Sequence, residues 1–159
     1  GVVHRDLKSA NVFIEAGTDR VKLLDLGFAK VTDEHAVTDP EQLLGTPLYI
    51  SPEQCFDPRQ VDGRADLFSL GVLLFENLTG DFPYTWTSKR DLLKKVMSGT
   101  LERHAAKRRS EVPAWLDDAI ARSLAFDRER RFADAGEMRA ALERGGRPQR
   151  TSLLKRLLK

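Results

Sequence analysis

The spacing of apolar residues changes along the chain and predicts two kinds of element. Residues 12–14 and 21–24 are short apolar runs rich in β-branched side chains, and A-G-T-D at residues 16–19 is typical of a turn. Together they predict a β-hairpin. From residue 25 to about residue 48 the periodicity is weak and Gly, Pro, Thr and Asp are frequent, so we expect a long functional loop.

The second half of the chain has the apolar repeat of helices, at three and four residues. Residues 66–79 are apolar on nearly every side and end at Gly80, which is typical of a helix inside a core. Ser51 followed by Pro52 predicts the start of a short helix. Further amphipathic helices are expected at residues 88–97, from Pro113 onward, and at residues 133–144 with Gly145 and Gly146 as the stop. The pattern predicts an α+β domain that is mainly helical.

Composition narrows the classes of protein that fit. The length of 159 residues suits one domain with its own core, placed at residues 1–145. Lys and Arg total 26 against 24 Asp and Glu, and this balance argues against a nucleic-acid-binding protein. The single cysteine, Cys55, excludes an internal disulfide and fits a reducing compartment, so we expect a cytoplasmic protein. The longest apolar run, residues 70–75, is far shorter than the roughly 20 residues that cross a bilayer.

The two ends of the chain carry different signals. A dense polar motif begins at residue 4, which is unusual for a chain end that frays, so we interpret the chain as a piece of a longer protein. Residues 146–159 form a basic amphipathic tail, with leucines on one helical face and cations on the other. The tail fits an anionic membrane surface and equally a chain end that docks on its own domain. We therefore expect membrane contact only through the tail.

Five motifs with chemically active residues follow one another along the chain. They are H-R-D-L-K-S-A-N at residues 4–11, D-L-G at 25–27, G-T-P-L-Y-I-S-P-E at 45–53, D-L-F-S-L-G at 66–71 and D-R-E-R-R-F at 127–132. In this order and at these intervals they resemble the motifs of eukaryotic-like (Hanks-type) bacterial serine/threonine protein kinases, over about residues 1–144. The resemblance implies the C-terminal lobe of the protein-kinase fold, helical with a small hairpin, with the N-terminal lobe absent from this chain.

The resemblance implies roles for four residues of the first two motifs. Asp6 would orient the substrate hydroxyl and accept its hydrogen bond, and Lys8 would place a cation against the γ-phosphate of ATP. Asn11 and Asp25 would offer oxygen atoms to Mg²⁺ or Mn²⁺, which prefer such ligands. A hairpin brings its two ends together, so residues 11 and 25 can converge on one ion. ATP and a divalent cation are the expected cofactors.

The same resemblance bears on substrate class and regulation. Lys8 points to Ser/Thr substrates, because related tyrosine kinases usually carry an alanine-arginine pattern there, and Thr46 would contact the catalytic pair and help to hold the substrate. Arg5 implies regulation, because a phosphorylated loop can pair with a cation at this position. Thr38, and after it Thr32, are the candidate phosphorylation sites.

Three residues are expected to build the architecture around the site. Glu53 and Arg131 would form a buried ion pair that ties the segment 45–53 to the helical core. Asp66, at the start of the central helix, would accept backbone N–H bonds from the catalytic loop. Ser9 stands where the family usually has proline, a departure that leaves the expected ligands in place.

Other side chains have simpler interpretations. His104 is expected at the surface without a partner, Cys55 as a small buried side chain, and Trp115 in the core. Trp86 is expected either in the core or at the edge of a substrate groove. Glu76 is expected either to face basic residues of a substrate or to lie on a solvated surface.

The expected function is that of a kinase that transfers the γ-phosphate of Mg·ATP to Ser or Thr hydroxyls of proteins. No glycine-rich loop and no strand lysine precede the first motif within this chain, and kinase activity needs both. We therefore expect weak ATP binding and negligible transfer by the chain alone, and exposed apolar surface where the missing parts dock.

Partners and rival functions follow from the same residues. The expected partners are protein substrates, the missing N-terminal lobe and a second copy for trans-autophosphorylation. A non-catalytic kinase-like module that binds or regulates another protein is one alternative, and a small-molecule phosphotransferase is another. The intact set Asp6, Lys8, Asn11 and Asp25 favours catalysis over binding alone.

Overall fold

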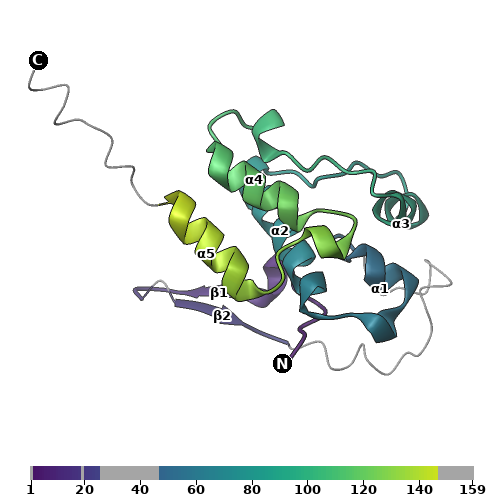
Figure 1. Ribbon diagram of the computed structural model, residues 1–159, viewed down its shortest axis with the longest axis horizontal. Helices are drawn as coiled ribbons and strands as arrows, with labels where there is room; N and C mark the ends of the chain where they lie inside the picture. The colour runs from purple at the N-terminus through teal and green to yellow at the C-terminus, as the bar shows by residue number, and fades with distance from the viewer. Residues whose placement is uncertain (1, 19, 26–46, 147–159) are drawn as a thin grey trace, which may run out of the picture.

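The computed structural model describes residues 2–18, 20–25 and 47–146, and these residues form a helical body with one small sheet (Figure 1). The strands and α-helices are β1 (Val12–Glu15), β2 (Arg20–Leu23), α1 (Pro52–Phe56), α2 (Gly63–Thr79), α3 (Lys89–Ser98), α4 (Ala114–Ser123) and α5 (Ala135–Gly146). Short 3₁₀ turns are η1 (Ser9–Asn11), η4 (Pro58–Gln60), η5 (Ala105–Lys107) and η6 (Arg128–Arg130). The predicted α+β class with a mainly helical domain is confirmed.

Strands β1 and β2 form the predicted hairpin. They pair antiparallel, with Val12 opposite Leu23 and Glu15 opposite Arg20. Gly17 in the turn has a φ of +81°, a left-handed conformation that glycine adopts without strain. The hairpin stands at one edge of the helical body (Figure 1). Its large exposed apolar side chains are Phe13, Ile14, Val21 and Leu23.

Helix α2 forms the centre of the body. Phe68, Val72 and Phe75 are fully buried, as the apolar pattern around this helix predicts. The helix begins three residues earlier than predicted, because the Asp62 side chain accepts the backbone N–H of Arg64 and caps it. It ends at Gly80 as predicted, in a left-handed conformation.

Helices α2 and α4 lie in close contact through a glycine. A Cβ atom added to Gly71 would lie 2.8 Å from the Cβ of Ser123, a distance that real Cβ atoms do not tolerate. Ile120 and Leu124 of the α4 region are fully buried in the same core as Phe75. The missing side chain at residue 71 therefore sets how near the two helices can come.

Helices α1 and α3 build a second cluster beside this core. In α1, the backbone N–H of Ser51 donates to the side chain of Gln54 at 3.0 Å, which fixes the predicted start of the helix. At the start of α3 the Ser88 hydroxyl accepts the backbone N–H of Asp91 at 3.2 Å, and the helix ends at Gly99 with a φ of +67°. Cys55 packs here against α3 residues and is buried, as predicted.

The last part of the described chain differs from the prediction in both bounds of α5, which begins at Ala135 and not at residue 133, and in the burial of Trp115. Helix α5 runs through Gly145 and Gly146 instead of stopping there, because Trp115 of α4 packs against this end. A Cβ atom on Gly145 would lie 2.5 Å from the indole ring, so only glycine allows the contact. Trp115 itself is 37% exposed and is not the core residue predicted, since the contact covers only part of the ring.

The prediction that His104 has no partner is wrong. Its Nδ1 atom lies 2.8 Å from a carboxylate oxygen of Asp117, which is buried at the start of α4. The other carboxylate oxygen accepts the backbone N–H of Ala106 at 2.9 Å. These bonds hold the turn η5 against α4. The periodicity of apolar residues gives no signal for such polar contacts.

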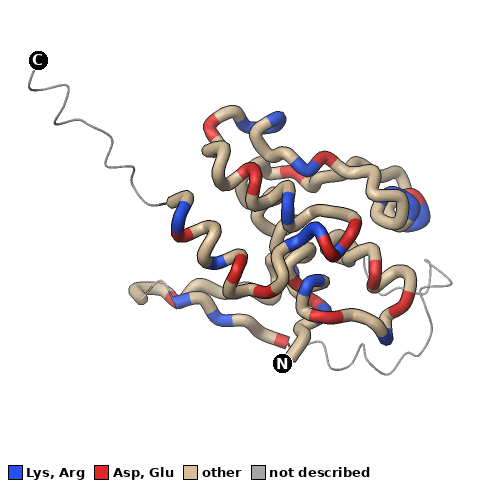
Figure 2. Tube along the Cα trace, in the orientation of Figure 1, with Lys and Arg blue, Asp and Glu red and all other residues tan. Residues whose placement is uncertain are grey.

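Charges of both signs are interspersed over the described chain (Figure 2), in agreement with the near balance in composition. No helix in the described residues is long and apolar enough to cross a membrane. The same residues contain no cluster of three or more His, Cys, Asp or Glu side chains that could hold a metal ion. The tail from residue 147 onward lies outside the described residues.

Candidate active site

The loop at residues 4–11 brings three of the predicted site residues together. Lys8 Nζ lies 2.8 Å from a carboxylate oxygen of Asp6. Asn11 donates from its amide nitrogen to the Asp6 carbonyl at 2.9 Å and to the carboxylate at 3.4 Å. Both bonds use the nitrogen, so the amide oxygen of Asn11, the atom that a hard cation would bind, takes no part in them.

Asp66 fixes the backbone of this loop by two hydrogen bonds. Its two carboxylate oxygens accept the backbone N–H groups of His4 at 2.7 Å and of Arg5 at 2.8 Å. Arg5 has a φ of +65°, a left-handed conformation that is rare for a side chain other than glycine. Two charge-assisted bonds from the first turn of α2 therefore stabilise a strained backbone one residue before Asp6.

Asp25 is placed by the hairpin. The backbone N–H of Leu24 donates to the Asn11 carbonyl at 2.9 Å, so the two ends of the hairpin meet as predicted. His4 is buried, and its Nε2 lies 3.1 Å from the Leu24 carbonyl oxygen. Asp25 follows directly and has a φ of +55°. The bond between the strand ends thus places the backbone of Asp25 one residue away from the partner of Asn11.

The predicted ion pair between Glu53 and Arg131 is present and joins α1 to the segment after α4. Arg131 donates from both terminal nitrogens to the two Glu53 oxygens, at 2.7 and 2.9 Å. The Arg131 side chain is fully buried, and it also donates to the carbonyl oxygens of Ala125 and Arg64 at 2.8 and 2.9 Å. A bidentate pair with further bonds to backbone carbonyls satisfies a charge that burial would otherwise penalise.

A further set of contacts was missed by the sequence analysis. The Tyr49 hydroxyl lies 2.7 Å from the Ser9 hydroxyl and donates to a Glu76 carboxylate oxygen at 2.5 Å. Burial, followed by the hydrogen bond to the Glu76 carboxylate, raises the pKa of Tyr49 above its usual value. The linked side chains of Ser9, Tyr49 and Glu76 join the loop at residues 4–11, the segment before α1 and the last turns of α2.

Gln54 makes a second link between segments that are distant in the sequence. Its side-chain nitrogen donates to the carbonyl oxygen of Arg5 at 2.9 Å, while its side-chain oxygen accepts from Ser51. Each of these links joins residues 40 or 49 positions apart, so periodicity carries no signal for them. The proline usually found at residue 9 cannot make the first link.

Several predicted residues lie outside the described residues. They are Thr32, Thr38 and Thr46. Their expected roles in regulation and substrate contact stay predictions. The charged group on Arg5 likewise stays without a defined function, since its backbone alone takes part in the bonds described above.

Comparison with known proteins gives a consistent result. The protein kinase domain family matches residues 1–143. The serine/threonine-protein kinase PknB of Mycobacterium tuberculosis H37Rv is 37% identical over 169 residues, which cover 97% of this chain and 26% of that protein. PknB of Mycobacterium leprae is 37% identical over 91% of this chain and 23% of its own length. PknL of Mycobacterium tuberculosis H37Rv is 37% identical over 90% of this chain and 35% of its own length.

The chain thus spans about a quarter to a third of the curated relatives it matches. The match includes the loop at residues 4–11, the hairpin, helices α1 to α4 and most of α5. With this family match over most of its length, the chain belongs to the protein kinase family and resembles the bacterial serine/threonine kinases within it.

Proposed function

We propose that this chain supplies the catalytic and substrate-holding part of a serine/threonine kinase that transfers the γ-phosphate of Mg·ATP to proteins. The observation that carries the proposal is the convergence of Lys8 and Asn11 on Asp6, in a loop that Asp66 holds by two hydrogen bonds. Structural binding modules have no need of a carboxylate, a cation and an amide in this arrangement. Phosphoryl transfer needs them for positioning and for charge neutralisation.

Asp6 is the residue that orients the acceptor. Its carboxylate is about one-fifth exposed and is positioned by hydrogen bonds from Lys8 and Asn11, so a substrate hydroxyl can reach it from solvent. An ordinary aspartate has a pKa of about 4 and is a weak base at pH 7. Its contribution is therefore to aim the hydroxyl oxygen and to take the proton late in the reaction.

Lys8 supplies a positive charge near the transferred group, and Asn11 and Asp25 supply ligand oxygens. Mg·ATP provides the phosphoryl group and the divalent cation when it is bound. The amide oxygen of Asn11 and the carboxylate of Asp25 would hold the cation, a two-ligand set that suits Mg²⁺ because its other ligands come from phosphate and water. Lys8 keeps a positive charge beside the acceptor site and balances the charge of Asp6.

Glu53, Asp66 and Arg131 have a structural role in the proposal. They hold α1, the segment before it and the loop at residues 4–11 in fixed positions. The contacts that support this are the bidentate pair between α1 and Arg131 and the bonds from Asp66 to the loop backbone. The chain spans a minor share of its relatives, so four further properties of the longer protein belong to the same proposal. They are tight ATP binding, a cytoplasmic location, trans-autophosphorylation and regulation through Arg5.

The test is a transfer assay with labelled ATP and Mg²⁺, run with the longest product of the gene that contains this chain and with the 159-residue chain. We expect phosphoserine or phosphothreonine on a protein acceptor from the longer product, and negligible transfer from the chain alone. Label on small alcohols or amines instead of protein would favour the small-molecule phosphotransferase. Absence of transfer to any acceptor would favour a kinase-like binding module.

A further inference from the structure

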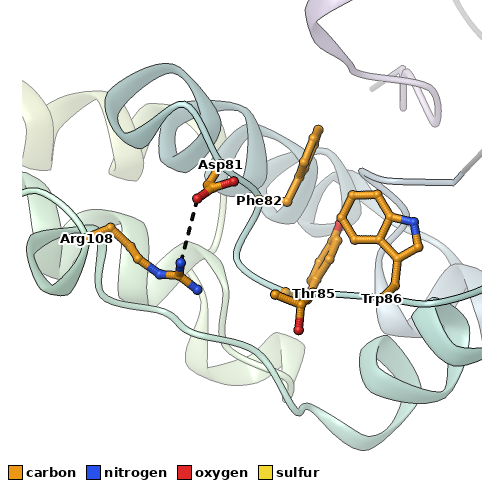
Figure 3. A pocket seen from close by; sticks show the side chains of 6 residues that line it. Asp81, Phe82, Thr85, Trp86 and Arg108 are labelled. Atoms are coloured by element: carbon orange, nitrogen blue, oxygen red, sulfur yellow. Dashed lines mark ion pairs between the residues drawn. The ribbon is translucent and has the colours of Figure 1, made fainter.

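A cavity of about 250 Å³ opens where α2 ends, outside the catalytic loop. It is lined by Asp81, Phe82, Tyr84, Thr85, Trp86 and Arg108. Figure 3 shows the ion pair of Asp81 and Arg108 on one side and the rings of Phe82 and Trp86 on the other. The centroids of these two rings lie 5.6 Å apart and the ring planes are nearly perpendicular. An apolar cavity of about 150 Å³ already admits benzene, so this one has room for a large side chain.

The cavity is connected to the candidate active site through packed aromatic rings. Phe82 packs edge to face against Tyr49, with 5.7 Å between ring centroids. Tyr49 in turn bonds to Ser9, the residue after Lys8. A polypeptide whose acceptor hydroxyl lies at Asp6 and whose chain follows this segment would therefore pass close to the cavity.

Three features of the cavity favour a positive charge. The Asp81 carboxylate at its rim is 69% exposed. The aromatic faces of Phe82 and Trp86 attract cations through their ring quadrupoles. The C-terminal end of α2, at Thr79 and Gly80, adds a negative partial charge, and Arg109 offsets part of it by donating to the Leu78 carbonyl at 3.0 Å. The apolar walls suit the aliphatic stem that a lysine or arginine carries below its charged head.

The chain already places one guanidinium group at this rim. Arg108 lies 3.7 Å from Asp81, near the outer limit of an ion pair, and its side chain is 42% exposed. Exposed pairs at such distances contribute little free energy, because solvent screens them. A second cation that also fills the apolar space can therefore take the place of Arg108.

We propose that this cavity binds an arginine or lysine side chain of the protein substrate, at a position distant from the acceptor hydroxyl. Asp81 pairs with the cation, Phe82 and Trp86 cover its stem, and Arg108 is an internal occupant that the substrate displaces. The inference rests on the proposed kinase function and adds to it a specificity site for basic residues.

The binding half of the inference is tested on the 159-residue chain without ATP. The probes are three alanine-based peptides that carry one arginine, citrulline or glutamate, and the readout is the indole N–H signals in nuclear magnetic resonance spectra. The chain has two tryptophans, so Trp115→Phe assigns the Trp86 signal. We expect the arginine peptide to shift the Trp86 signal and to bind about two- to fivefold more tightly than the citrulline peptide.

Variants of the two charged residues at the cavity rim test whether Asp81 causes the preference for arginine. Asp81→Asn should abolish the preference for arginine, and Arg108→Ala should strengthen binding of the arginine peptide because it removes the internal competitor. Arg139→Ala is the matched control, since it breaks an exposed ion pair with Glu143 on α5. Equal binding of the arginine and citrulline peptides, tighter binding of the glutamate peptide, or weaker arginine binding in Arg108→Ala would each overturn the inference.

A second measurement separates this inference from the proposed function. In a longer gene product that transfers phosphate, Asp81→Asn should raise the KM for an arginine-bearing substrate about two- to fivefold and leave kcat and the KM for ATP unchanged. A KM that does not move contradicts the specificity site alone. Arginine-selective binding by a protein that transfers no phosphate contradicts the kinase function alone.

Discussion

Arg131 carries the least exposed charge among the described residues. Its guanidinium has Glu53 and three backbone carbonyls as partners within 3.2 Å, so the whole arrangement depends on both members of the pair. We expect Arg131→Ala to lower the free energy of unfolding by about 3–5 kcal/mol, because it leaves the mostly buried Glu53 carboxylate without its cation. Urea unfolding of the chain measures this.

The control for this prediction is Arg139→Ala on α5. Arg139 pairs with Glu143 at 3.5 Å, and both side chains are largely exposed. Such a pair contributes little to stability, so the unfolding midpoint should stay almost unchanged. If Arg131→Ala and Arg139→Ala unfold at the same urea concentration, the structural role given to the buried pair is wrong.

The hydroxyl groups of the two tyrosines differ in their hydrogen bonding, so the two residues can be compared directly. The Tyr84 hydroxyl is buried and has no hydrogen-bond partner among the described residues, whereas the Tyr49 hydroxyl bonds to Ser9 and Glu76. Removing an unsatisfied buried hydroxyl costs no bond, so Tyr84→Phe should keep or raise stability, by up to about 1 kcal/mol. Tyr49→Phe should lower it by about 1 kcal/mol, because its bonds are lost. Thermal unfolding of both variants gives the comparison, and the opposite order would contradict it.

Residue contacts at the site divide into those that the sequence predicts and those that it does not. The Glu53–Arg131 pair and the bonds from Asp66 to the loop backbone were expected from the family resemblance, and both contacts are present. The bond between Ser9 and Tyr49 was not expected. Ser9 departs from the family pattern, and a polar contact between residues 40 positions apart leaves no periodic trace.

At the scale of elements, the contact between α2 and α4 makes a specific prediction. A side chain on Gly71 would overlap Ser123 and lie 3.2 Å from Leu124, and both of these residues are buried. Gly71→Ala should therefore destabilise the chain by about 1–3 kcal/mol through overpacking. Gly63→Ala, at the start of the same helix, has no atom within 4 Å of the added Cβ and should be neutral or stabilising. Equal unfolding free energies for the two variants would contradict this packing.

The link between η5 and α4 predicts a pH dependence. Burial raises the pKa of Asp117, but the hydrogen bonds from the Ala106 N–H and from His104 outweigh it, so the pKa of Asp117 lies below its usual value. The ionised carboxylate therefore stabilises the fold above the ordinary aspartate pKa of about 4, and this contribution is lost as the pH falls through the lowered folded value.

The variant Asp117→Asn tests this link. The difference in unfolding free energy between the native chain and Asp117→Asn should be full at pH 7 and shrink below about pH 4. Urea unfolding across this range measures the difference. A constant difference from pH 7 to pH 3 would show that the carboxylate charge plays no part in holding η5.

Elements were predicted well where periodicity decides them and less well where single side chains do. The all-round apolar pattern of residues 66–79 places α2 at the centre, which is where it lies. Its true start depends on one cap, Asp62, and the true end of α5 depends on the contact between Trp115 and Gly145. A cap and a ring-on-glycine contact are local or tertiary details, and a hydrophobic pattern does not encode them.

At the scale of the whole molecule, six of the ten exposed large apolar side chains among the described residues lie on or near the hairpin. Large apolar side chains on the hairpin and beside it are 45–70% exposed. They are Val2, Phe13, Ile14, Val21, Leu23 and Leu24. Exposed apolar surface was expected where further parts of a kinase dock, and apolar surface of this extent marks a contact surface. We propose that an N-terminal lobe covers it, which agrees with a chain that matches only part of its relatives.

The central claim is that the loop around Asp6 carries out phosphoryl transfer. The most direct measurement is incorporation of labelled γ-phosphate into a protein acceptor by the longest gene product and by its Asp6→Asn variant. Asn keeps the size of the side chain, and the bonds from Asp66 to the loop backbone do not involve Asp6. We predict that transfer falls by about a hundredfold or more while binding of the protein acceptor survives. Undiminished transfer by Asp6→Asn would contradict the claim.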